Sequence, residues 1–354
     1  MKEVDNKNQF FRKQLLDWNA EHNHRDMPWK GEKDPYKIWL SEIILQQTRV
    51  EQGLAYYNRF IKTFPTVHHL AKAPDNTVFK LWEGLGYYTR CKNLIASAKY
   101  ISVELKGKFP DKYEDILALK GIGPYTAAAI GSFAFNLPHA VVDGNVFRVL
   151  ARYFGIETAT DTTEGKKLFT NLANELLDKK TPGIYNQALM DFGAVICKPQ
   201  QPLCHECPLQ KTCTAYQHDL INVLPVKEKT IIKKPRWLYY FIVEHNGNVY
   251  VRKRTGKDVW QNLYEFFLVE NEKELSLKEI EKLTVLKKAI GKIQFELIDI
   301  SKIYKQVLSH QIIYGQFIKV KILSELEIDG FEIVGKKKLK TLPFPKLINS
   351  YLEE

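Results

Sequence analysis

Residues 197–213 read CKPQQPLCHECPLQKTC and place four cysteines in one short segment, spaced Cys197-x6-Cys204-x2-Cys207-x5-Cys213. Four thiolates this close in the chain can surround a single metal centre. Zinc sites commonly pair two C-x2-C knuckles, whereas this segment has one knuckle and unequal loops. Unequal loops suit the four-cysteine ligation of an iron–sulfur cluster better. The segment therefore favours an iron–sulfur cluster, and a structural zinc ion is the alternative.

The composition indicates a cytoplasmic protein with polyanionic partners. The chain has 354 residues, of which 45% are hydrophobic and 12% aromatic, as expected for two or three packed domains. No apolar run approaches the roughly 18–20 residues of a membrane span, and the start, MKEVDNKNQF, lacks a signal-peptide core. The net charge of +11 favours nucleic acid, because each phosphate contact releases counterions. The fifth cysteine, Cys91, is expected to be buried rather than to bind metal.

Hydrophobic periodicity divides the chain into a helical part and a strand-rich part. A polar segment with two prolines, residues 217–235, separates them and is expected to be a linker. We predict an all-α domain over residues 1–216 and a smaller α/β domain over residues 236–354. Helical spacing occurs in 10–18, 36–47, 54–64, 93–103 and 168–177; strands are expected at 237–244, 249–253, 264–269 and 312–323, with a helix at 275–289.

Residues 117–127, LALKGIGPYTA, predict two helices joined by a tight turn. Gly121 and Gly123 permit backbone conformations with positive φ and the close approach of a ligand. Pro124 suits the first position of a helix, where exposed amides can bind a phosphate. An ordinary helix–helix turn is the alternative for an isolated GxG.

Glu42 lies in IWLSEIILQQT, residues 38–48, where its neighbours on a helix are apolar. Burial on that face would desolvate the carboxylate and raise its pKa. An exposed glutamate at the edge of the face is the alternative.

Asp143 lies in AVVDGNVFRVL, residues 140–150, just before a predicted helix. Backbone amides and the helix dipole would keep such a carboxylate ionised. A simple N-cap is the alternative.

These motifs, in this order, resemble the endonuclease III and adenine DNA glycosylase (MutY) superfamily, whose cysteine spacing and helix-hairpin-helix are similar. The resemblance implies one 4Fe–4S cluster on Cys197, Cys204, Cys207 and Cys213. It also implies that Glu42 is the general acid/base and that Asp143 stabilises the transition state, with Asn145 orienting it. Two carboxyl groups with separated pKa values can protonate a leaving base and stabilise the cationic sugar.

Tyr125 distinguishes two branches of the superfamily. Bifunctional members of the endonuclease III branch carry a lysine at this position, which attacks the sugar. A phenol cannot form a Schiff base. We therefore expect a monofunctional adenine glycosylase with Tyr125 in its active site. An endonuclease III-type glycosylase/lyase is the alternative, and a non-catalytic DNA-binding or electron-transfer iron–sulfur protein is a third reading.

The resemblance extends to residues that bind DNA and to the C-terminal domain. Val251–Arg254 and Asn262–Phe266 resemble the Nudix-like domain of the family, but the chain has no Arg-Glu dipeptide and therefore no working Nudix box. Leu308-Ser309-His310 is similar to a Phe-Ser-His loop that reads the lesion, so Ser309 and His310 inherit lesion recognition. The DNA contacts that the resemblance implies are Arg25, Gln47, Thr48, Leu85, Tyr87, Gly121, Gly123 and Lys198.

The expected protein is a multidomain repair enzyme that removes adenine paired with 8-oxoguanine or guanine in double-stranded DNA. The helical domain would comprise a six-helix part, about 30–135, and a cluster part, 1–29 plus 136–216. The enzyme is expected to act as a monomer in the bacterial cytoplasm, associated with the nucleoid when bound to DNA.

Overall fold

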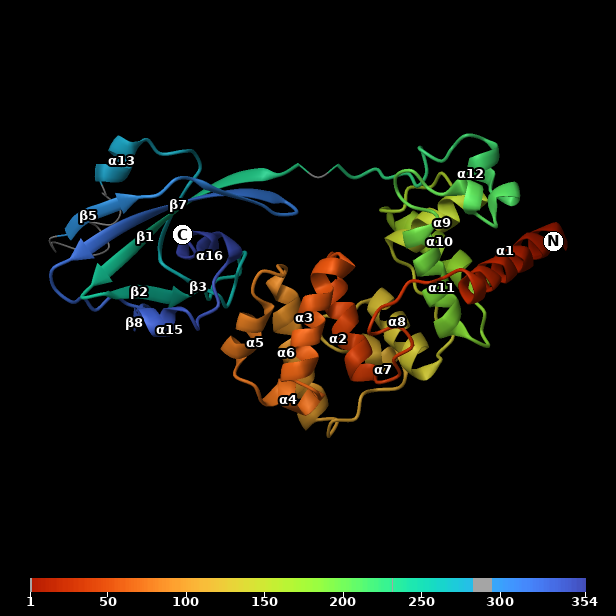
Figure 1. The fold of residues 1–354 in the computed structure, drawn as a ribbon, viewed down its shortest axis with the longest axis horizontal. Helices are drawn as coiled ribbons and strands as arrows, with labels where there is room; N and C mark the ends of the chain where they lie inside the picture. Colours follow the sequence, from red (N-terminus) through yellow and green to blue (C-terminus); the bar gives the residue numbers. More distant parts are fainter. Residues whose placement is uncertain (1, 231, 283–294) are drawn as a thin grey trace. The chain divides into compact units, whose positions relative to one another are not determined.

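The computed structural model describes residues 2–230, 232–282 and 295–354. The chain forms two compact units (Figure 1): unit 1 contains residues 1–71 and 96–229, and unit 2 contains residues 72–95 and 230–354. Across the described residues, no helix is long and apolar enough to cross a membrane.

Unit 1 is helical, as its periodicity predicts. Two of its helices begin at capping aspartates: Asp34 accepts a hydrogen bond from the amide of Tyr36, and Asp143 accepts one from the amide of Val146. The elements are α1 (Lys2–Glu21), α2 (Pro35–Leu45), α3 (Val50–Thr63), α4 (Val67–Lys72), α7 (Tyr113–Leu117), α8 (Pro124–Phe135), α9 (Gly144–Phe154), α10 (Thr163–Leu176), α11 (Pro182–Val195), the 3-10 turns η1 (Cys204–Glu206) and η2 (Gln210–Thr212), and α12 (Thr214–Gln217).

The helix α9 ends at Gly155, which has a φ of 68°. A Cβ atom at this position would also lie 2.5 Å from Cγ2 of Thr214. Both the left-handed backbone and the close approach of α12 therefore require glycine here.

A buried core holds α1, α9, α10 and α11 together. Phe11, Leu150, Phe169 and Phe192 are fully or almost fully buried within it, and Cys197 and other residues of the cysteine segment pack against it. Trp18 of α1 packs edge-on against Phe192 of α11, with ring centroids 5.0 Å apart. This packing fixes the cysteine segment beside α9.

Unit 2 is built around a mixed sheet. The strands β1 and β7 pair in parallel, while the other pairs are antiparallel, in the order β3-β2-β1-β7-β5. Its elements are α5 (Asp75–Trp82), the first part of α6 (Tyr88–Val103), β1 (Lys234–His245), β2 (Asn248–Lys253), β3 (Tyr264–Glu265), β4 (Phe267–Asn271), α13 (Leu277–Lys282), β5 (Phe295–Ile300), β6 (Tyr304–Val307), β7 (Gln311–Ile322), β8 (Glu332–Gly335), α15 (Lys336–Leu339) and α16 (Lys346–Leu352).

The predicted order, an all-α part followed by an α/β part, is confirmed, with one difference among the predicted strands. The strand expected at 264–269 is divided at Phe266, because β3 pairs with β2 whereas β4 pairs with β1. The helix expected at 275–289 is described as α13 up to Lys282, and the rest lies outside the described residues.

The segment 217–235, expected to be a linker, also includes ordered structure. Leu224 is buried in the core of unit 1, and the carbonyl of Val226 accepts a hydrogen bond from the amide of Thr160. At the other end, Lys234 and Pro235 belong to β1 and pair with Gln311 and Ile312. The segment lacks a periodic apolar face, so these individual attachments are not evident from its pattern.

Candidate active site

Glu42 lies on α2 and is only 7% exposed. Its carboxylate accepts a 2.8 Å hydrogen bond from the hydroxyl of Tyr125, in the first turn of α8. Burial raises the pKa of Glu42 to about 7; the Tyr125 hydrogen bond opposes this shift and the charge of Asp143 adds to it. Glu42 can therefore hold or release a proton near neutral pH.

A cavity of about 180 Å³ opens beside Glu42. Trp29 and Phe133 form part of its wall, and Ser41 and Gln187 add polar groups. This small volume suits a planar heterocycle rather than a larger ligand.

Asp143 caps α9 and lies close enough to Glu42 for its negative charge to raise the pKa of that carboxyl group. Its Oδ1 accepts from the amide of Val146 at 2.7 Å, and its Oδ2 accepts from the side-chain amide of Asn145 at 2.8 Å. Burial is nevertheless the largest influence and raises the pKa of Asp143, with these donors opposing it. The backbone amides favour the ionised form, as the sequence suggests, and the burial that packing produces acts in the opposite direction.

The sequence reasoning missed Arg148, which lies one turn after Asn145 on α9. Its Nη2 donates to Oδ1 of Asn145 at 2.8 Å and to the carbonyl of Gly193 at 2.7 Å, while its Nε donates to the carbonyl of Cys197 at 2.7 Å. One guanidinium therefore connects the partner of Asp143 to the cysteine segment. Its position three residues after Asn145, on the same face of a predicted helix, is the signal that could have identified it.

Arg152, one turn further along α9, also binds the cysteine segment. Its Nη1 donates to the carbonyl of Lys198 at 2.7 Å and approaches Sγ of Cys197 at 3.5 Å. This contact fixes the backbone of Lys198, one of the predicted DNA contacts, while its own ammonium group has no hydrogen bond among the described residues.

The four clustered cysteines line one cavity of about 30 Å³. Burial raises the pKa of the Cys207 thiol to about 12 and raises the pKa values of Cys204 and Cys213 as well. Thiols in this setting need a bound cation to become thiolates at neutral pH. Within the described ranges, no group of three or more His, Cys, Asp or Glu side chains is arranged to hold a single metal ion. Cys91 is buried elsewhere, in α6, as expected.

The hairpin connects α7 to α8 as expected, but its two glycines differ. Gly121 has a φ of 83° and requires a residue without a Cβ atom. Gly123 has a φ of −102° and caps α8, with open space where a Cβ atom would project. Gly123 therefore does not adopt the positive φ that glycine permits, while access for a ligand remains.

The expected DNA contacts of unit 1 occupy different settings. Gln47 is exposed and has a φ of 54°, a conformation that is rare for a residue with a side chain. Thr48 donates to the carbonyl of Gln46. Arg25 instead pairs with Asp191 at 2.8 Å, and Asp191 is fully buried. This ion pair gives Arg25 a structural partner that its sequence context does not reveal.

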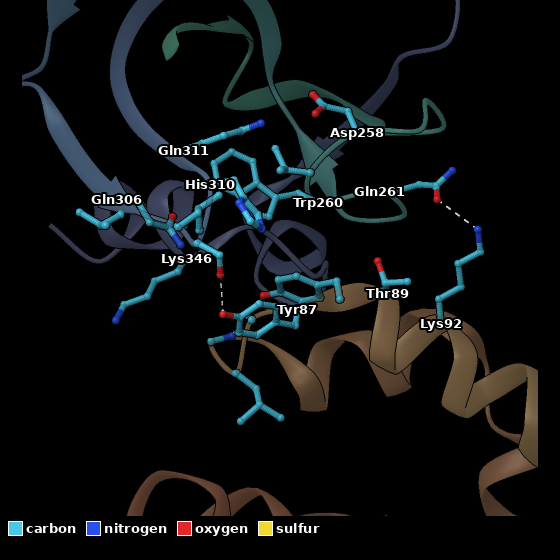
Figure 2. A pocket seen from close by; sticks show the side chains of 18 of the residues that line it. Tyr87, Thr89, Lys92, Asp258, Trp260, Gln261, Gln306, His310, Gln311 and Lys346 are labelled. Carbon is cyan, nitrogen blue, oxygen red and sulfur yellow. Dashed lines mark hydrogen bonds between the residues drawn. The ribbon is translucent and has the colours of Figure 1, made fainter. Parts of the chain in front are cut away.

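Unit 2 contains a second cavity, of about 830 Å³, which Figure 2 shows from close by. The hydroxyls of Tyr87 and Ser309 are hydrogen-bonded at 2.7 Å, although 222 residues separate them in sequence. Leu85 and His310 also line this cavity. The structure thus brings the predicted lesion-recognition residues Ser309 and His310 together with Leu85 and Tyr87, two of the predicted DNA contacts.

Comparisons with known proteins agree with both parts of the fold. Residues 40–175 match the family model "HhH-GPD superfamily base excision DNA repair protein", and residues 238–354 match "NUDIX domain". The structure of a thermostable thymine-DNA glycosylase aligns with a TM-score of 0.56 and 30% identity, over 61% of this chain and 99% of that one. A complex of endonuclease III with DNA shares the fold at a TM-score of 0.52 and 21% identity, over 60% and 98%.

Named relatives are also similar to this chain in sequence. The adenine DNA glycosylase of Buchnera aphidicola subsp. Baizongia pistaciae is 37% identical over 270 residues, which cover 74% of this chain and 75% of that protein. The adenine DNA glycosylase of Mus musculus is 42% identical over 216 residues, which cover 58% and 42%. The chain therefore belongs to the adenine DNA glycosylase family, and it is a DNA glycosylase of base excision repair.

Proposed function

We propose that this enzyme hydrolyses the N-glycosidic bond of adenine paired with 8-oxoguanine or guanine. The observation that carries the proposal is the buried Glu42, with a pKa of about 7, beside Tyr125 and close to Asp143. Adenine is a poor leaving group as an anion, so its departure needs a proton at the base. A carboxyl group that titrates near neutral pH is suited to supply this proton.

The two carboxyl groups would divide the reaction between them. Glu42, when protonated, donates its proton to N7 of adenine as the glycosidic bond breaks. Asp143, in its ionised form, faces the oxocarbenium ion that remains, while Asn145 holds its Oδ2 in position at 2.8 Å. Glu42 then accepts a proton from the attacking water. The substrate adenine must leave the DNA stack to reach this pocket.

The hydroxyl of Tyr125 supports a monofunctional reaction. A lyase needs an amine to form a Schiff base with the sugar, and Tyr125 offers a phenol that is already bound to Glu42. Borohydride treatment of the reaction should therefore trap no covalent protein–DNA adduct. A trapped adduct on the wild-type protein would favour an endonuclease III-type lyase instead.

Cys197, Cys204, Cys207 and Cys213 would hold one 4Fe–4S cluster, since all four line the same cavity. When bound, the cluster supplies cross-linking of the segment and a redox-active centre. The residues of the chain fix that segment onto α9 through Arg148 and Arg152. Reconstituted protein is expected to hold four irons per chain; one tightly bound zinc ion would contradict the assignment.

The remaining roles concern binding and organisation. We expect a monomer that acts in the bacterial cytoplasm, at the nucleoid when bound to DNA, with domains over 1–216 and 236–354 joined by 217–235. Ser309 and His310 would distinguish 8-oxoguanine from guanine. The phosphate and base contacts in DNA would come from Arg25, Gln47, Thr48, Leu85, Tyr87, Gly121, Gly123 and Lys198.

A single-turnover assay tests the reaction. A duplex with one A:8-oxoguanine pair is incubated with protein and then cleaved by alkali at abasic sites. Glu42→Gln should lower the rate roughly 10²- to 10⁴-fold, the usual range for loss of a general acid. Asp143→Asn should be similarly inactive, while both variants keep their affinity for the duplex. Glu164→Gln, at an exposed glutamate in the first turn of α10, is the matched control and should excise normally.

A further inference from the structure

Asp143 follows a segment without helix or strand, residues 136–142, which leads from α8 to α9. The hydrogen bonds that Asp143 makes with Val146 and Asn145 lie after this segment and fix the carboxylate to the start of α9. They do not fix it relative to Glu42, which belongs to α2. Backbone groups of such a segment have no regular ladder and must find their partners elsewhere, often in side chains. The position of Asp143 therefore depends on which side chains bind residues 136–142.

Asn186, on α11, supplies partners of this kind. Its side chain is buried, with an exposure of 1%. Oδ1 accepts a hydrogen bond from the amide of Val141 at 3.1 Å, and Nδ2 donates to the carbonyl of His139 at 2.9 Å. One residue of a parallel β-strand binds its neighbour in the same pattern, through a carbonyl and an amide two residues apart. The amide of Asn186 thus holds the segment as an adjacent strand would.

The same side-chain amide also binds α8. Nδ2 donates to Oγ of Ser132 at 3.0 Å, and Ser132 is fully buried. An asparagine amide has two N–H donors and one carbonyl acceptor, and each of these groups of Asn186 has a partner. Burial of a polar side chain is tolerated when its groups are satisfied in this way. One side chain of α11 therefore joins α8 to the segment that follows it.

The helix α11 that bears Asn186 is itself closely packed. A Cβ atom at Gly183 would lie 2.6 Å from the carbonyl oxygen of Ser132 on α8. A Cβ atom at Gly193 would lie 2.7 Å from Cβ of Asn145 on α9. Contacts this close leave no room for a methyl group and allow little movement between the helices. The helix therefore holds Asn186 at a fixed place between α8 and α9.

A further polar contact of the segment lies at the surface. The amide of Ala140 donates to Oδ1 of Asn174 at 3.1 Å, and the side chain of Asn174 is exposed on α10. Water can replace an exposed acceptor, whereas a buried backbone group that loses its partner stays unsatisfied. The two asparagines bind the same segment, and only the loss of Asn186 leaves buried groups without partners. Asn174 is therefore the matched control for Asn186.

We propose that Asn186 is a positioning residue of adenine excision: its amide holds residues 139–141, and through them it places Asp143 beside the Glu42 pocket. The inference rests on the role proposed for Asp143 and deepens it. A carboxylate stabilises a developing cation best when it is held in place beforehand. A displacement of about 1 Å at such a group can reduce the rate roughly 10²-fold. Asn186 acts through this placement rather than by touching the reacting atoms.

Asn186→Asp tests this role with a side chain of the same shape. Its carboxylate accepts from Val141 but cannot donate to His139 or Ser132. Single-turnover excision from a duplex with an A:8-oxoguanine pair should slow about 10- to 100-fold, while affinity for the duplex stays within about twofold. The protonated acid can donate again, so the ratio of variant to wild-type rate should rise as the pH falls from about 8 to about 6.

Hydrogen exchange of the peptide that contains residues 136–142, followed by mass spectrometry, reports on the segment independently of activity. Exchange should be faster in Asn186→Asp than in wild type, because buried hydrogen bonds are lost. Asn174→Asp makes the same chemical change, retains the acceptor for Ala140, and should leave excision and exchange unchanged. Asn186→Ser, whose short hydroxyl cannot span both backbone groups, is the second variant if Asn186→Asp melts below the assay temperature.

Faster exchange with an unchanged excision rate overturns the proposal, since the segment would then be released without consequence for Asp143. Equal losses of excision rate and duplex affinity also overturn it, because they mark a purely structural residue. The proposed function fails separately if wild-type protein releases no adenine or if Asp143→Asn excises normally. The inference would fall with it, whereas hydrogen exchange would still show whether Asn186 holds the segment.

Discussion

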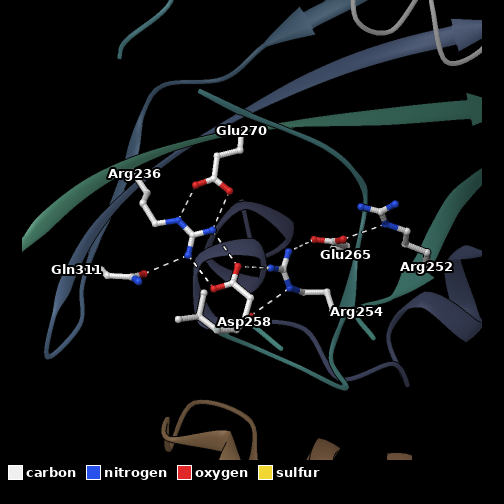
Figure 3. A network of polar contacts seen from close by, with 8 residues as sticks. Arg236, Arg252, Arg254, Asp258, Glu265, Glu270 and Gln311 are labelled. Carbon is white, nitrogen blue, oxygen red and sulfur yellow. Dashed lines mark hydrogen bonds and ion pairs between the residues drawn. The ribbon is translucent and has the colours of Figure 1, made fainter. Parts of the chain in front are cut away.

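Glu42 and Glu265 are both buried glutamates, at 7% and 2% exposure, in contrasting surroundings. Glu265 in unit 2 accepts from Arg252 at 2.9 Å and also pairs with Arg254 (Figure 3). Glu42 in unit 1 has the phenol of Tyr125 as its donor and forms no ion pair in the part of the chain that the structure describes. One carboxylate is held by two cations, and the other by a neutral group.

The ion network of unit 2 extends beyond Glu265. Arg236 binds Asp258 and Glu270, and Arg254 binds Asp258 as well. The Arg236 hydrogen bond is the largest influence that lowers the pKa of Asp258, whereas burial raises that of Glu42 to about 7. The carboxylates that pair with arginines stabilise the fold of unit 2. Glu42, which has no cationic partner among the described residues, can instead hold a proton near neutral pH.

Removing an ion-paired carboxylate of unit 2 should have the largest effect on stability. Glu265→Gln leaves Arg254 with a buried, less compensated charge, and such changes typically destabilise by about 3–5 kcal/mol. Denaturant unfolding, followed by a probe in unit 2, measures the loss. Glu270→Gln removes a partner of Arg236 whose side chain is 44% exposed, and should destabilise by less than about 1 kcal/mol. Equal losses in the two variants would contradict the distinction.

Removing the unpaired charge should stabilise the protein at high pH. The pKa of Glu42 is about 7 in the fold, against a usual value of 4.5. Between these values the unfolded chain has lost its proton and the folded chain keeps it, so the free energy of unfolding falls as pH rises. Glu42→Gln avoids this loss, which is on the order of 3 kcal/mol.

Melting of both proteins from pH 4 to pH 8.5 checks the sign. The variant should match wild type near pH 4 and exceed it above pH 7. A wild type that is more stable than the variant at pH 8 would show that Glu42 has a compensating cation.

Arg148→Lys tests the hydrogen-bonded connection between the cysteine segment and Asn145, the partner of Asp143. Lysine retains the charge but cannot donate simultaneously to Asn145, Gly193 and Cys197, so a loss on the order of 2 kcal/mol is expected. Asn145 would lose its anchor, and the excision rate should fall more than DNA affinity does. Arg12→Lys, on α1, is the control, because its contacts are to carbonyls at the end of α10. An excision rate as high as that of wild type would show that Arg148 does not position Asp143.

Tyr125→Phe should have the smallest effect of these variants, and it tests directly how a neutral donor sets the pKa of Glu42. The Tyr125 hydrogen bond opposes the upward shift in the pKa of Glu42, so its loss should raise that pKa by up to about one unit. The rate should then stay high to a correspondingly higher pH. Tyr100→Phe, at an exposed tyrosine of α6, should leave the pH profile unchanged. A shift to lower pH would refute the donor role of Tyr125.

Local signals made some of these features predictable from sequence. The apolar neighbours of Glu42 indicate its raised pKa, and the residues after Asp143 indicate a capped helix. Enrichment in aromatic and β-branched residues indicates β1 and β7. Each of these properties depends on a few consecutive residues.

Other features depend on contacts between distant segments. The burial of Asp143, the ion pair between Arg25 and Asp191, and the contact of Tyr87 with Ser309 arise only when separate elements pack. The left-handed backbone of Trp260 likewise contradicts its local preference, and tertiary contacts impose it.

The hydroxyl pair of Tyr87 and Ser309 has a consequence for selectivity. These hydroxyls already satisfy each other at 2.7 Å, so a base that engages Ser309 must exchange one hydrogen bond for another. Exchange between equivalent partners contributes little net free energy, since a hydrogen bond is worth only about 1 kcal/mol after such competition. A base that merely substitutes for Tyr87 therefore gains almost nothing, and one that offers an additional donor gains a full contact. Binding at Ser309 would therefore favour a base that offers a hydrogen bond which Tyr87 does not already supply.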